Sequence, residues 1–123
     1  MTKIMIVEDD QTTVKLLTYL LEKKNYKVVC FPNGQRAVEE ASKEMPDLIL
    51  MDIMMPIMDG IEATEKIKSD EKTSSIPIIF LSALGQEMEV MKGLQSGADG
   101  YVIKPFDSKA LLKLIEDKIN SAS

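Results

Sequence analysis

Acidic residues stand directly after two apolar runs of this sequence. Glu8 and Asp9 follow the run Ile-Met-Ile-Val at 4–7, and Asp52 follows the run Leu-Ile-Leu-Met at 48–51. Apolar runs of this length predict strands that are buried on both faces. Open α/β sheets bind their ligands at the carboxyl ends of their strands. We therefore expect Asp52 to be the reactive group, with other polar side chains around it.

A hydroxyl and a lysine complete the set. Ser82 follows the apolar run at 76–81, and Lys104 follows the short run at 101–103. Lys104 would neutralise negative charge on a group that reacts with Asp52, and Ser82 would donate a hydrogen bond to that group. Taken singly, Ser82 is typical of a turn at a strand end and Lys104 of a solvated surface. Their joint occurrence with the acids indicates a site.

Three carboxylates brought together repel one another, and at least one pKa rises unless a positive charge intervenes. A hard divalent cation relieves this repulsion, and a site of oxygen ligands that keeps bound waters favours Mg²⁺, with Mn²⁺ as an alternative. The candidate ligands are Glu8, Asp9, Asp52 and the backbone carbonyl of Met54. A carboxylate beside such a cation can attack a phosphoryl donor and form an aspartyl phosphate.

Alternating strand and helix patterns must position these groups. Strands are predicted at 4–7, 26–31, 48–51, 76–81 and 101–103, and helices over 11–24 and around 37–45, 61–67, 88–94 and 111–119. Asp10 is expected to cap the first helix, and Asp107 or Ser108 the last. The alternation predicts an α/β fold, a doubly wound five-stranded parallel sheet of flavodoxin-like order 2-1-3-4-5 with helices on both faces. We expect one domain over residues 1–123.

Composition excludes several classes of protein. The formal charge of −5 comes without any lysine- and arginine-rich patch, which argues against direct nucleic-acid binding. The chain has no histidine, so histidine-based catalysis and histidine metal ligands are excluded. The single cysteine, Cys30, is interpreted as a small buried hydrophobic residue in a strand. No signal peptide and no membrane-spanning segment are predicted, so we expect a cytoplasmic protein.

Four ordered motifs resemble those of a known family. They are IVEDD at 6–10, LILMDIMMPIMDG at 48–60, LSA at 81–83 and GADGYVIKPF at 97–106. Asp52 and Ser82 stand 30 residues apart, and Ser82 and Lys104 stand 22 apart. In these motifs and spacings the whole chain resembles a two-component response-regulator receiver domain, and in particular its single-domain, chemotaxis-regulator-like members.

The resemblance implies a role for each matching residue. Asp52 matches the phosphoacceptor, Lys104 the lysine at the phosphoryl group, and Ser82 the hydroxyl switch residue. Glu8 and Asp9 match the acidic pair that binds Mg²⁺, with Asp9 the direct ligand, and Met54 matches the position whose backbone carbonyl is also a ligand. Tyr101 matches the aromatic residue that turns inward on activation, and Pro105 a proline preceded by a cis peptide bond.

The implied function is a phosphorylation-dependent signalling switch rather than a metabolic enzyme. A phosphohistidine on a histidine kinase or phosphotransfer protein would be the donor, as in a phosphorelay. A downstream protein target would contact the fourth helix, fifth strand and last helix, roughly residues 86–120. The resemblance also implies a monomer or a weak phosphorylation-dependent dimer. The sequence leaves open whether the chain acts alone or belongs to a longer regulator.

Three other functions compete with this interpretation. A receiver-like interaction scaffold would not be phosphorylated, but the phosphoacceptor, acid pair, hydroxyl and lysine are all present. Phosphohydrolases of the haloacid-dehalogenase type carry a second aspartate two residues after the nucleophile, where this chain has Met54. A flavodoxin-like FMN carrier needs a phosphate-binding loop after the first strand, where acids at 8–10 would repel a phosphate.

Met54 and Leu84 stand two residues after Asp52 and Ser82, respectively. In receiver domains these two positions flank the phosphoryl group and affect the water that attacks it. Apolar side chains cannot orient that water. We therefore expect the phosphorylated form to be long-lived unless a phosphatase supplies a polar group.

Overall fold

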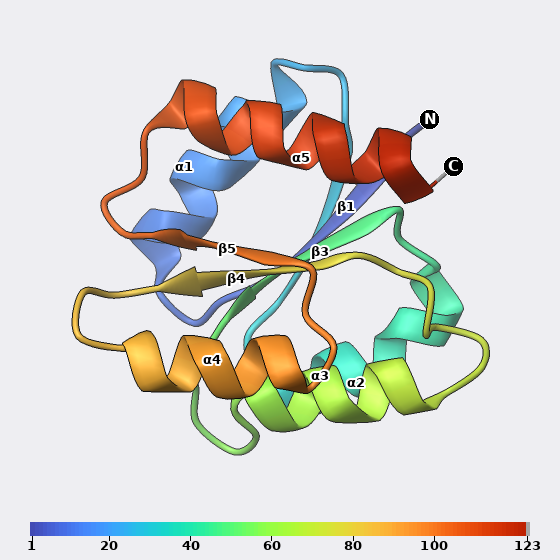
Figure 1. Ribbon diagram of the computed structural model, residues 1–123. Helices are drawn as coiled ribbons and strands as arrows, with labels where there is room; N and C mark the ends of the chain where they lie inside the picture. Colours follow the sequence, from blue (N-terminus) through green and yellow to red (C-terminus); the bar gives the residue numbers. More distant parts are fainter. Residues whose placement is uncertain (123) are drawn as a thin grey trace.

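A computed structural model describes residues 1–122 of the chain, so Ser123 of the predicted domain lies outside the described residues. Five strands alternate with five helices along this range (Figure 1). The strands are β1 (Lys3–Val7), β2 (Lys27–Phe31), β3 (Leu48–Asp52), β4 (Ile78–Ser82) and β5 (Gly100–Ile103). The helices are α1 (Gln11–Glu22), α2 (Gly34–Glu44), α3 (Gly60–Ser69), α4 (Glu87–Gln95) and α5 (Ser108–Ala122). All ten predicted elements are present, with ends displaced by a few residues.

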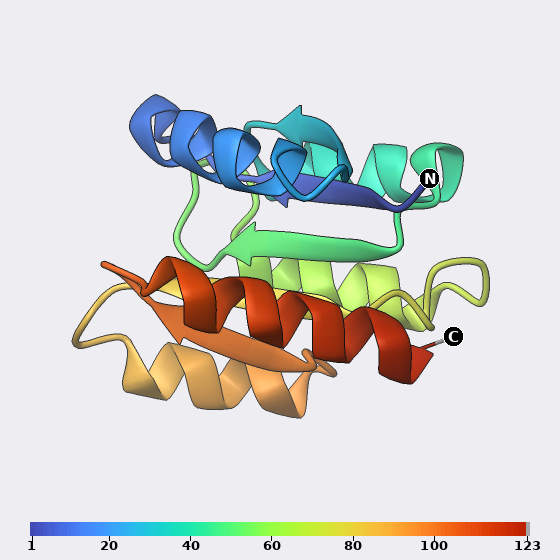
Figure 2. The same ribbon diagram turned by 90° about the horizontal axis from the view of Figure 1, so that it is seen from above.

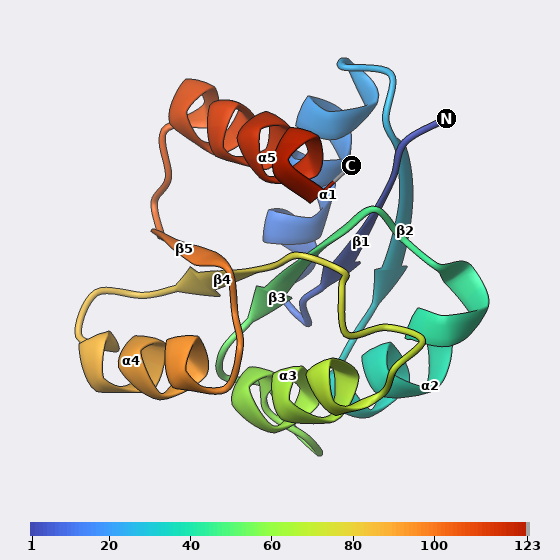
Figure 3. The ribbon, with the colours of Figure 1, turned by 45° about the vertical axis from the view of Figure 1, so that its right-hand side comes forward.

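All strand pairs are parallel, and the sheet order is β2-β1-β3-β4-β5, as predicted. Figure 3 shows this order, with β5 and β2 at the two edges. In the register, Asp52 of β3 stands beside Leu81 of β4, and Ser82 of β4 beside Ile103 of β5. The carboxyl ends of β1, β3, β4 and β5 therefore meet at one edge of the sheet.

Helices cover both faces of the sheet, as Figures 1 and 2 show. One hydrophobic core lies between the sheet and α1 and α5, where Leu17, Leu21, Leu111 and Ile115 are buried. The other core lies beneath α2, α3 and α4. β3 is buried along its whole length because helices cover both of its faces. No helix within the described range is long and apolar enough to cross a membrane.

Local signals in the sequence explain where the helices start. Asp10 accepts a hydrogen bond from the Thr13 backbone N–H at 3.2 Å and caps α1, as predicted. Asn33 caps α2, and Asp59 caps α3 by accepting from Glu62 N–H at 2.8 Å. An oxygen of these side chains satisfies an amide that has no partner inside the helix.

Two features of the molecule were not foreseen. Cys30 is exposed, so its interpretation as a buried residue is wrong, because β2 is an edge strand whose faces are only partly covered. Met88, Met91 and Leu94, whose spacing predicts the fourth helix, are all exposed in α4. The side of α4 that packs on the sheet instead carries Val90 and Gly93, where a Cβ atom on Gly93 would overlap the Phe80 ring.

Candidate functional site: an acidic pocket at the carboxyl edge of the sheet

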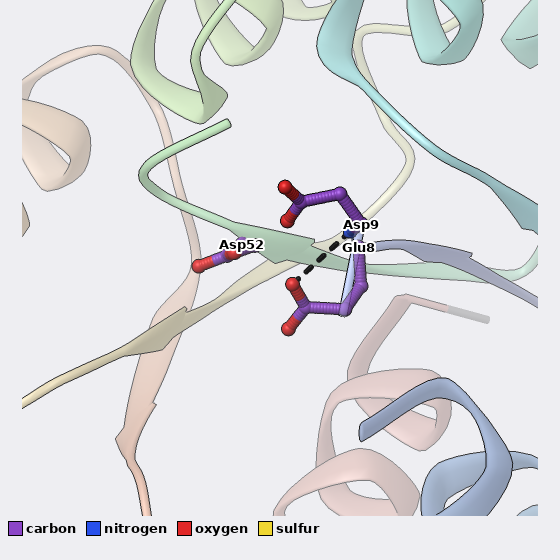
Figure 4. A group of neighbouring side chains, drawn as sticks. All are labelled: Glu8, Asp9 and Asp52. Carbon is purple, nitrogen blue, oxygen red and sulfur yellow. Dashed lines mark hydrogen bonds between the residues drawn. The ribbon is translucent and has the colours of Figure 1, made fainter. Parts of the chain in front are cut away.

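Glu8, Asp9 and Asp52 come together where β1 and β3 end. Ligand oxygens of the three carboxylates all lie within 4.8 Å of one another. Figure 4 shows Asp52 at the end of β3, with Glu8 and Asp9 on the segment after β1. The Asp9 backbone N–H donates to the Glu8 carboxylate at 3.1 Å, drawn as the dashed line. Glu8 and Asp52 are buried, whereas Asp9 is exposed.

The segment after β3 approaches the Asp52 backbone very closely. Gly60 donates its backbone N–H to the Ile53 carbonyl at 2.8 Å. A Cβ atom on Gly60 would lie 2.3 Å from the Asp52 carbonyl oxygen, so only glycine fits there. The pair Asp59-Gly60 is typical of a turn, but its close contact with the Asp52 backbone was not predicted. The dipeptide itself was the available signal.

Lys104 reaches the acids from the end of β5. Its Nζ lies 2.7 Å from Glu8 Oε1 and 3.7 Å from Asp52 Oδ1, so Glu8 is its nearer partner. Burial opposes the charged form, but the hydrogen bond to Glu8 and the charges of both acids raise the pKa of the Lys104 ammonium. The Lys104–Pro105 peptide bond is cis.

The two buried acids titrate differently. Burial and the neighbouring Glu8 carboxylate raise the pKa of Asp52 from 3.8 to about 7. For Glu8, burial raises the pKa, but hydrogen bonding with Asp52 and Lys104 outweighs it, so the pKa of Glu8 is lowered. The pocket thus holds more negative charge than its single lysine balances, and the hydrogen-bonded Glu8–Asp52 pair retains one proton up to near-neutral pH.

This donor set fits a hard divalent cation. Three carboxylates offer oxygen atoms at close range with one ammonium beside them, and no sulfur or imidazole takes part. Such a set suits Mg²⁺ or Mn²⁺ rather than a soft metal. Burial and the nearby carboxylates raise the pKa of Asp52, and a bound cation would relieve the repulsion between those carboxylates.

Ser82 and Tyr101 lie beside the groove between α4 and β5. Ser82 is buried, and its hydroxyl donates to the Val102 carbonyl at 3.3 Å. Tyr101 is 45% exposed. Both residues line a groove of about 180 Å³ between α4 and β5, together with Met91, Leu94 and Ile103. The Met54 and Leu84 side chains are also exposed, at 57% and 76%.

Comparison with known proteins identifies the family. The model of the response regulator receiver domain matches residues 4–116, which include every residue of the acidic pocket. The chain belongs to the response regulator receiver domain family. It is therefore a receiver domain of two-component signalling, with an acidic pocket at Glu8, Asp9 and Asp52.

Relatives of this receiver domain include both short and long proteins. Protein PilH of Pseudomonas aeruginosa is 41% identical over 94% of this chain and 95% of its own length. The Bacillus subtilis alkaline phosphatase synthesis transcriptional regulatory protein PhoP is 38% identical over 87% of this chain but only 44% of its own length. The chain thus spans about half the length of the transcriptional regulators that it matches.

Solved structures share this fold. The receiver domain of the sensor histidine kinase PA1611 from Pseudomonas aeruginosa superposes with a TM-score of 0.90 and 31% identity, covering 97% of this chain and 98% of that one. That structure holds a magnesium ion coordinated in its active-site cleft. The flavodoxin-like arrangement is therefore that of known receiver domains.

Proposed function

We propose that this receiver domain is a signalling switch that accepts a phosphoryl group on Asp52. The donor is a phosphohistidine of a histidine kinase or phosphotransfer protein, and the reaction depends on Mg²⁺. The observation that carries this proposal is the buried, electrostatically unbalanced Asp52 carboxylate, with Glu8 and Lys104 beside it. A buried carboxylate next to other negative charges is stabilised when a cation binds beside it or when its own negative charge is removed.

Glu8, Asp9 and Asp52, with the Met54 backbone carbonyl, are the proposed ligands of Mg²⁺. When bound, the cation supplies charge neutralisation at the transferring phosphoryl oxygens. The magnesium ion in the PA1611 receiver domain supports this assignment. Asp9 is the most exposed of the three acids, which fits a direct ligand that also leaves room for bound water.

The chemical step is a displacement at phosphorus. An Asp52 carboxylate oxygen attacks the phosphorus atom, the new O–P bond forms, and the N–P bond to the donor imidazole breaks. The imidazole leaves with the bonding electron pair and is protonated. Lys104 is only 3.7 Å from Asp52 Oδ1, so its ammonium is placed to pair with a phosphoryl oxygen. The domain catalyses only its own phosphorylation and dephosphorylation.

Phosphorylation adds about −1.5 to −2 charges and three strong acceptors at Asp52. Ser82 would exchange its hydrogen bond to Val102 for one to the phosphoryl group, and Tyr101 would turn into the groove beside it. The α4–β5–α5 surface would then differ between two states whose populations depend on one local charge. That surface exposes Met88, Met91 and Ile103, which suits a downstream protein target.

We place the protein in the cytoplasm, as a monomer or a weak phosphorylation-dependent dimer that does not contact nucleic acid directly. A receiver-like scaffold without phosphorylation is the alternative function. An aspartyl-phosphate phosphohydrolase is a weaker one, because Met54 stands where such enzymes carry their second aspartate.

Incubation with acetyl phosphate and Mg²⁺, followed by intact mass spectrometry, tests the proposal. The parent protein should gain one phosphoryl group, and Asp52→Asn should gain none. Asp59→Asn is the matched control, because Asp59 is an aspartate on the same segment that only caps α3. A parent protein that gains no phosphoryl group would support the scaffold instead, and full labelling of Asp52→Asn would place the acceptor elsewhere.

The lifetime of the phosphorylated form is a separate prediction. We expect replacement of Met54 by Asn and Leu84 by Glu to accelerate phosphate loss by about tenfold together, since a polar group can orient the attacking water. The measurement is the decay of the phosphorylated mass after removal of acetyl phosphate. Met88→Gln, on the exposed side of α4, serves as the control. Equal decay in all three proteins would contradict this role.

A further inference from the structure

Charge is divided unequally between the two faces of this receiver domain. Residues 11–31 and 105–122, which contain α1, β2 and α5, carry seven lysines and four acids. The rest of the chain carries eight lysines and arginines and sixteen acids. α1 and α5 lie together on one face of the sheet (Figure 1). The excess of lysines comes mainly from the α1–β2 loop and the start of β2, at Lys23, Lys24 and Lys27. This corner of the molecule is therefore positive in a protein that is negative overall, and it attracts anions.

A cavity of about 230 Å³ opens on this face, where the end of α1 and the start of β2 meet α5. Three lysines, a tyrosine, a leucine and a glutamate line it: Lys24, Tyr26, Lys109, Leu112, Lys113 and Glu116. None of these residues belongs to the acidic pocket or to the α4–β5 groove. The proposed phosphorylation chemistry thus leaves this cavity unexplained.

Two of the lysines have free ammonium groups. Lys113 is engaged, since its Nζ lies 3.1 Å from Asp117 Oδ1. Among the described residues, no carboxylate lies within 4 Å of the Lys24 or Lys109 ammonium. Glu116 is the one acid in the lining and offsets part of the charge. Two unpaired cations at one cavity favour a ligand that carries negative charge.

The remaining lining is apolar. Tyr26 and Leu112 are partly buried, and both pack against the core cluster that contains Leu17 and Leu21. Burial, together with the charge of Glu116, raises the pKa of the Tyr26 hydroxyl, so it stays neutral and can donate a hydrogen bond. A bare inorganic ion would leave the apolar part of the cavity in contact with water. An aromatic or short aliphatic body would cover it.

We propose that this α1–α5 cavity binds a small organic anion that has an apolar body and a phosphate or carboxylate group. Lys24 and Lys109 would pair with the anionic group, the Tyr26 hydroxyl would donate to it, and Leu112 would contact the body. Drug-sized ligands occupy pockets of about 300–1,000 Å³, so the ligand is smaller, with one ring or a short chain. The proposal does not depend on phosphorylation of Asp52.

Titration of the ¹⁵N-labelled protein with phenyl phosphate, followed by amide chemical shifts, tests the cavity. Phenyl phosphate should shift the amides of Lys24, Tyr26 and Leu112 in a saturable way. Inorganic phosphate, which lacks the body, and benzyl alcohol, which lacks the charge, should each bind at least about tenfold more weakly. Asp52→Asn should bind phenyl phosphate as the parent does, which separates this site from the proposed phosphorylation site.

Two lysine variants locate the binding. Lys24→Gln and Lys109→Gln should each weaken phenyl phosphate binding by about five- to tenfold, because each removes one charged hydrogen-bond donor. Lys72→Gln, an exposed lysine of the α3–β4 loop, should change nothing. Absence of saturable shifts would overturn the proposal. Equal binding of inorganic phosphate, or an equal loss in Lys72→Gln, would show general anion attraction and overturn it as well.

Discussion

Two lysine–carboxylate arrangements stand at opposite ends of β5 and serve different purposes. Asp99 precedes the strand, and its Oδ2 accepts from Lys68 Nζ at 2.9 Å and from the Ile78 N–H at 2.8 Å. Lys68 also donates to the carbonyls of Ile76 at 2.7 Å and Ser74 at 3.3 Å. Lys104 follows the strand and faces Glu8 and Asp52.

The difference lies in the balance of charge. At the Lys68 end, one cation meets one anion, backbone carbonyls accept the other hydrogen bonds of Lys68, and a backbone N–H donates to Asp99. At the Lys104 end, one cation lies beside a cluster of three acids, and burial together with the excess negative charge raises the pKa of Asp52. A balanced cluster stabilises the fold, whereas an unbalanced one is ready to bind a cation or to react.

The largest effect is expected when Lys104 is removed from the unbalanced cluster that it forms with Glu8 and Asp52. Lys104→Met should slow labelling by acetyl phosphate about 100-fold or more, because a preorganised charge at the transferring group is lost. Time-resolved mass spectrometry measures the rate. Lys68→Met, assayed at a temperature where it is folded, is the control and should label at the parent rate. Similar slowing in both variants would mean that the two ends do not differ in function.

The next largest effect is expected when the balanced cluster of Lys68 and Asp99 is disrupted. Lys68→Met should lower the free energy of unfolding by about 2–3 kcal/mol, since Asp99 and two carbonyls lose a charged donor. Urea unfolding followed by circular dichroism gives the value. The exposed Lys72→Met should stay within about 0.5 kcal/mol of the parent. A Lys68→Met variant as stable as Lys72→Met would contradict a structural role for this cluster.

A smaller effect concerns Asp52 of the unbalanced cluster, which should make the stability of the protein depend on pH. Because the pKa of Asp52 is about 7 in the folded protein but 3.8 for an unperturbed aspartate, the folded state holds this proton more strongly than the unfolded state. The folded protein therefore loses stability as the pH rises from about 4 to 7. Asp52→Asn should be about 1–2 kcal/mol more stable than the parent at pH 8 in EDTA, with the gap narrowing toward pH 5.

Urea unfolding of both proteins across this pH range measures that gap. Adding Mg²⁺ at pH 8 should narrow it, because a cation that binds the folded parent stabilises it. Asp59→Asn is expected to show no such gain. A gap that is constant from pH 5 to pH 8 would exclude Asp52 as the titrating group.

The smallest effect concerns a buried group outside both clusters. The Thr64 hydroxyl is the one buried side-chain N or O atom without a hydrogen-bond partner in the described part of the chain. Thr64→Val should therefore stabilise the protein by about 0.5–1 kcal/mol. Thr73→Val is the matched control, because its buried hydroxyl donates to the Ile67 carbonyl at 2.6 Å. It should cost about 1 kcal/mol. Destabilisation of both variants alike would show that Thr64 has a partner after all.

Much of the fold follows from short-range patterns. The runs at 48–51 and 76–81 predict buried strands because two covered faces leave no place for polar side chains. Parallel pairing and right-handed crossovers then restrict the order of the strands. Patterns of burial on exposed elements are less predictable. Met88 and Met91 have the spacing of a core stripe but lie outward, since Gly93 allows α4 to approach Phe80 on its other side.

In the candidate site, too, local patterns were predictable and contacts between remote segments were not. The meeting of the acids, the hydroxyl and the lysine was predicted, because each follows an apolar strand and the carboxyl ends of parallel strands share one edge. The distances between these groups were not predicted. Glu8 is closer than Asp52 to Lys104, and Gly60 is required by a contact with the Asp52 carbonyl. Such contacts depend on the relative placement of segments far apart in the chain.

By itself, the sequence determined the order of elements, the edge of the sheet at which the acids meet, and which polar residues stand at that edge, because periodicity and strand-end position are local properties. Only the tertiary structure decided how charge is shared within the acidic pocket, that Cys30 is exposed, and that lysines from the α1–β2 loop and α5 meet at one cavity. These features depend on burial and on distances between remote segments, which come into being only when the helices pack on the sheet.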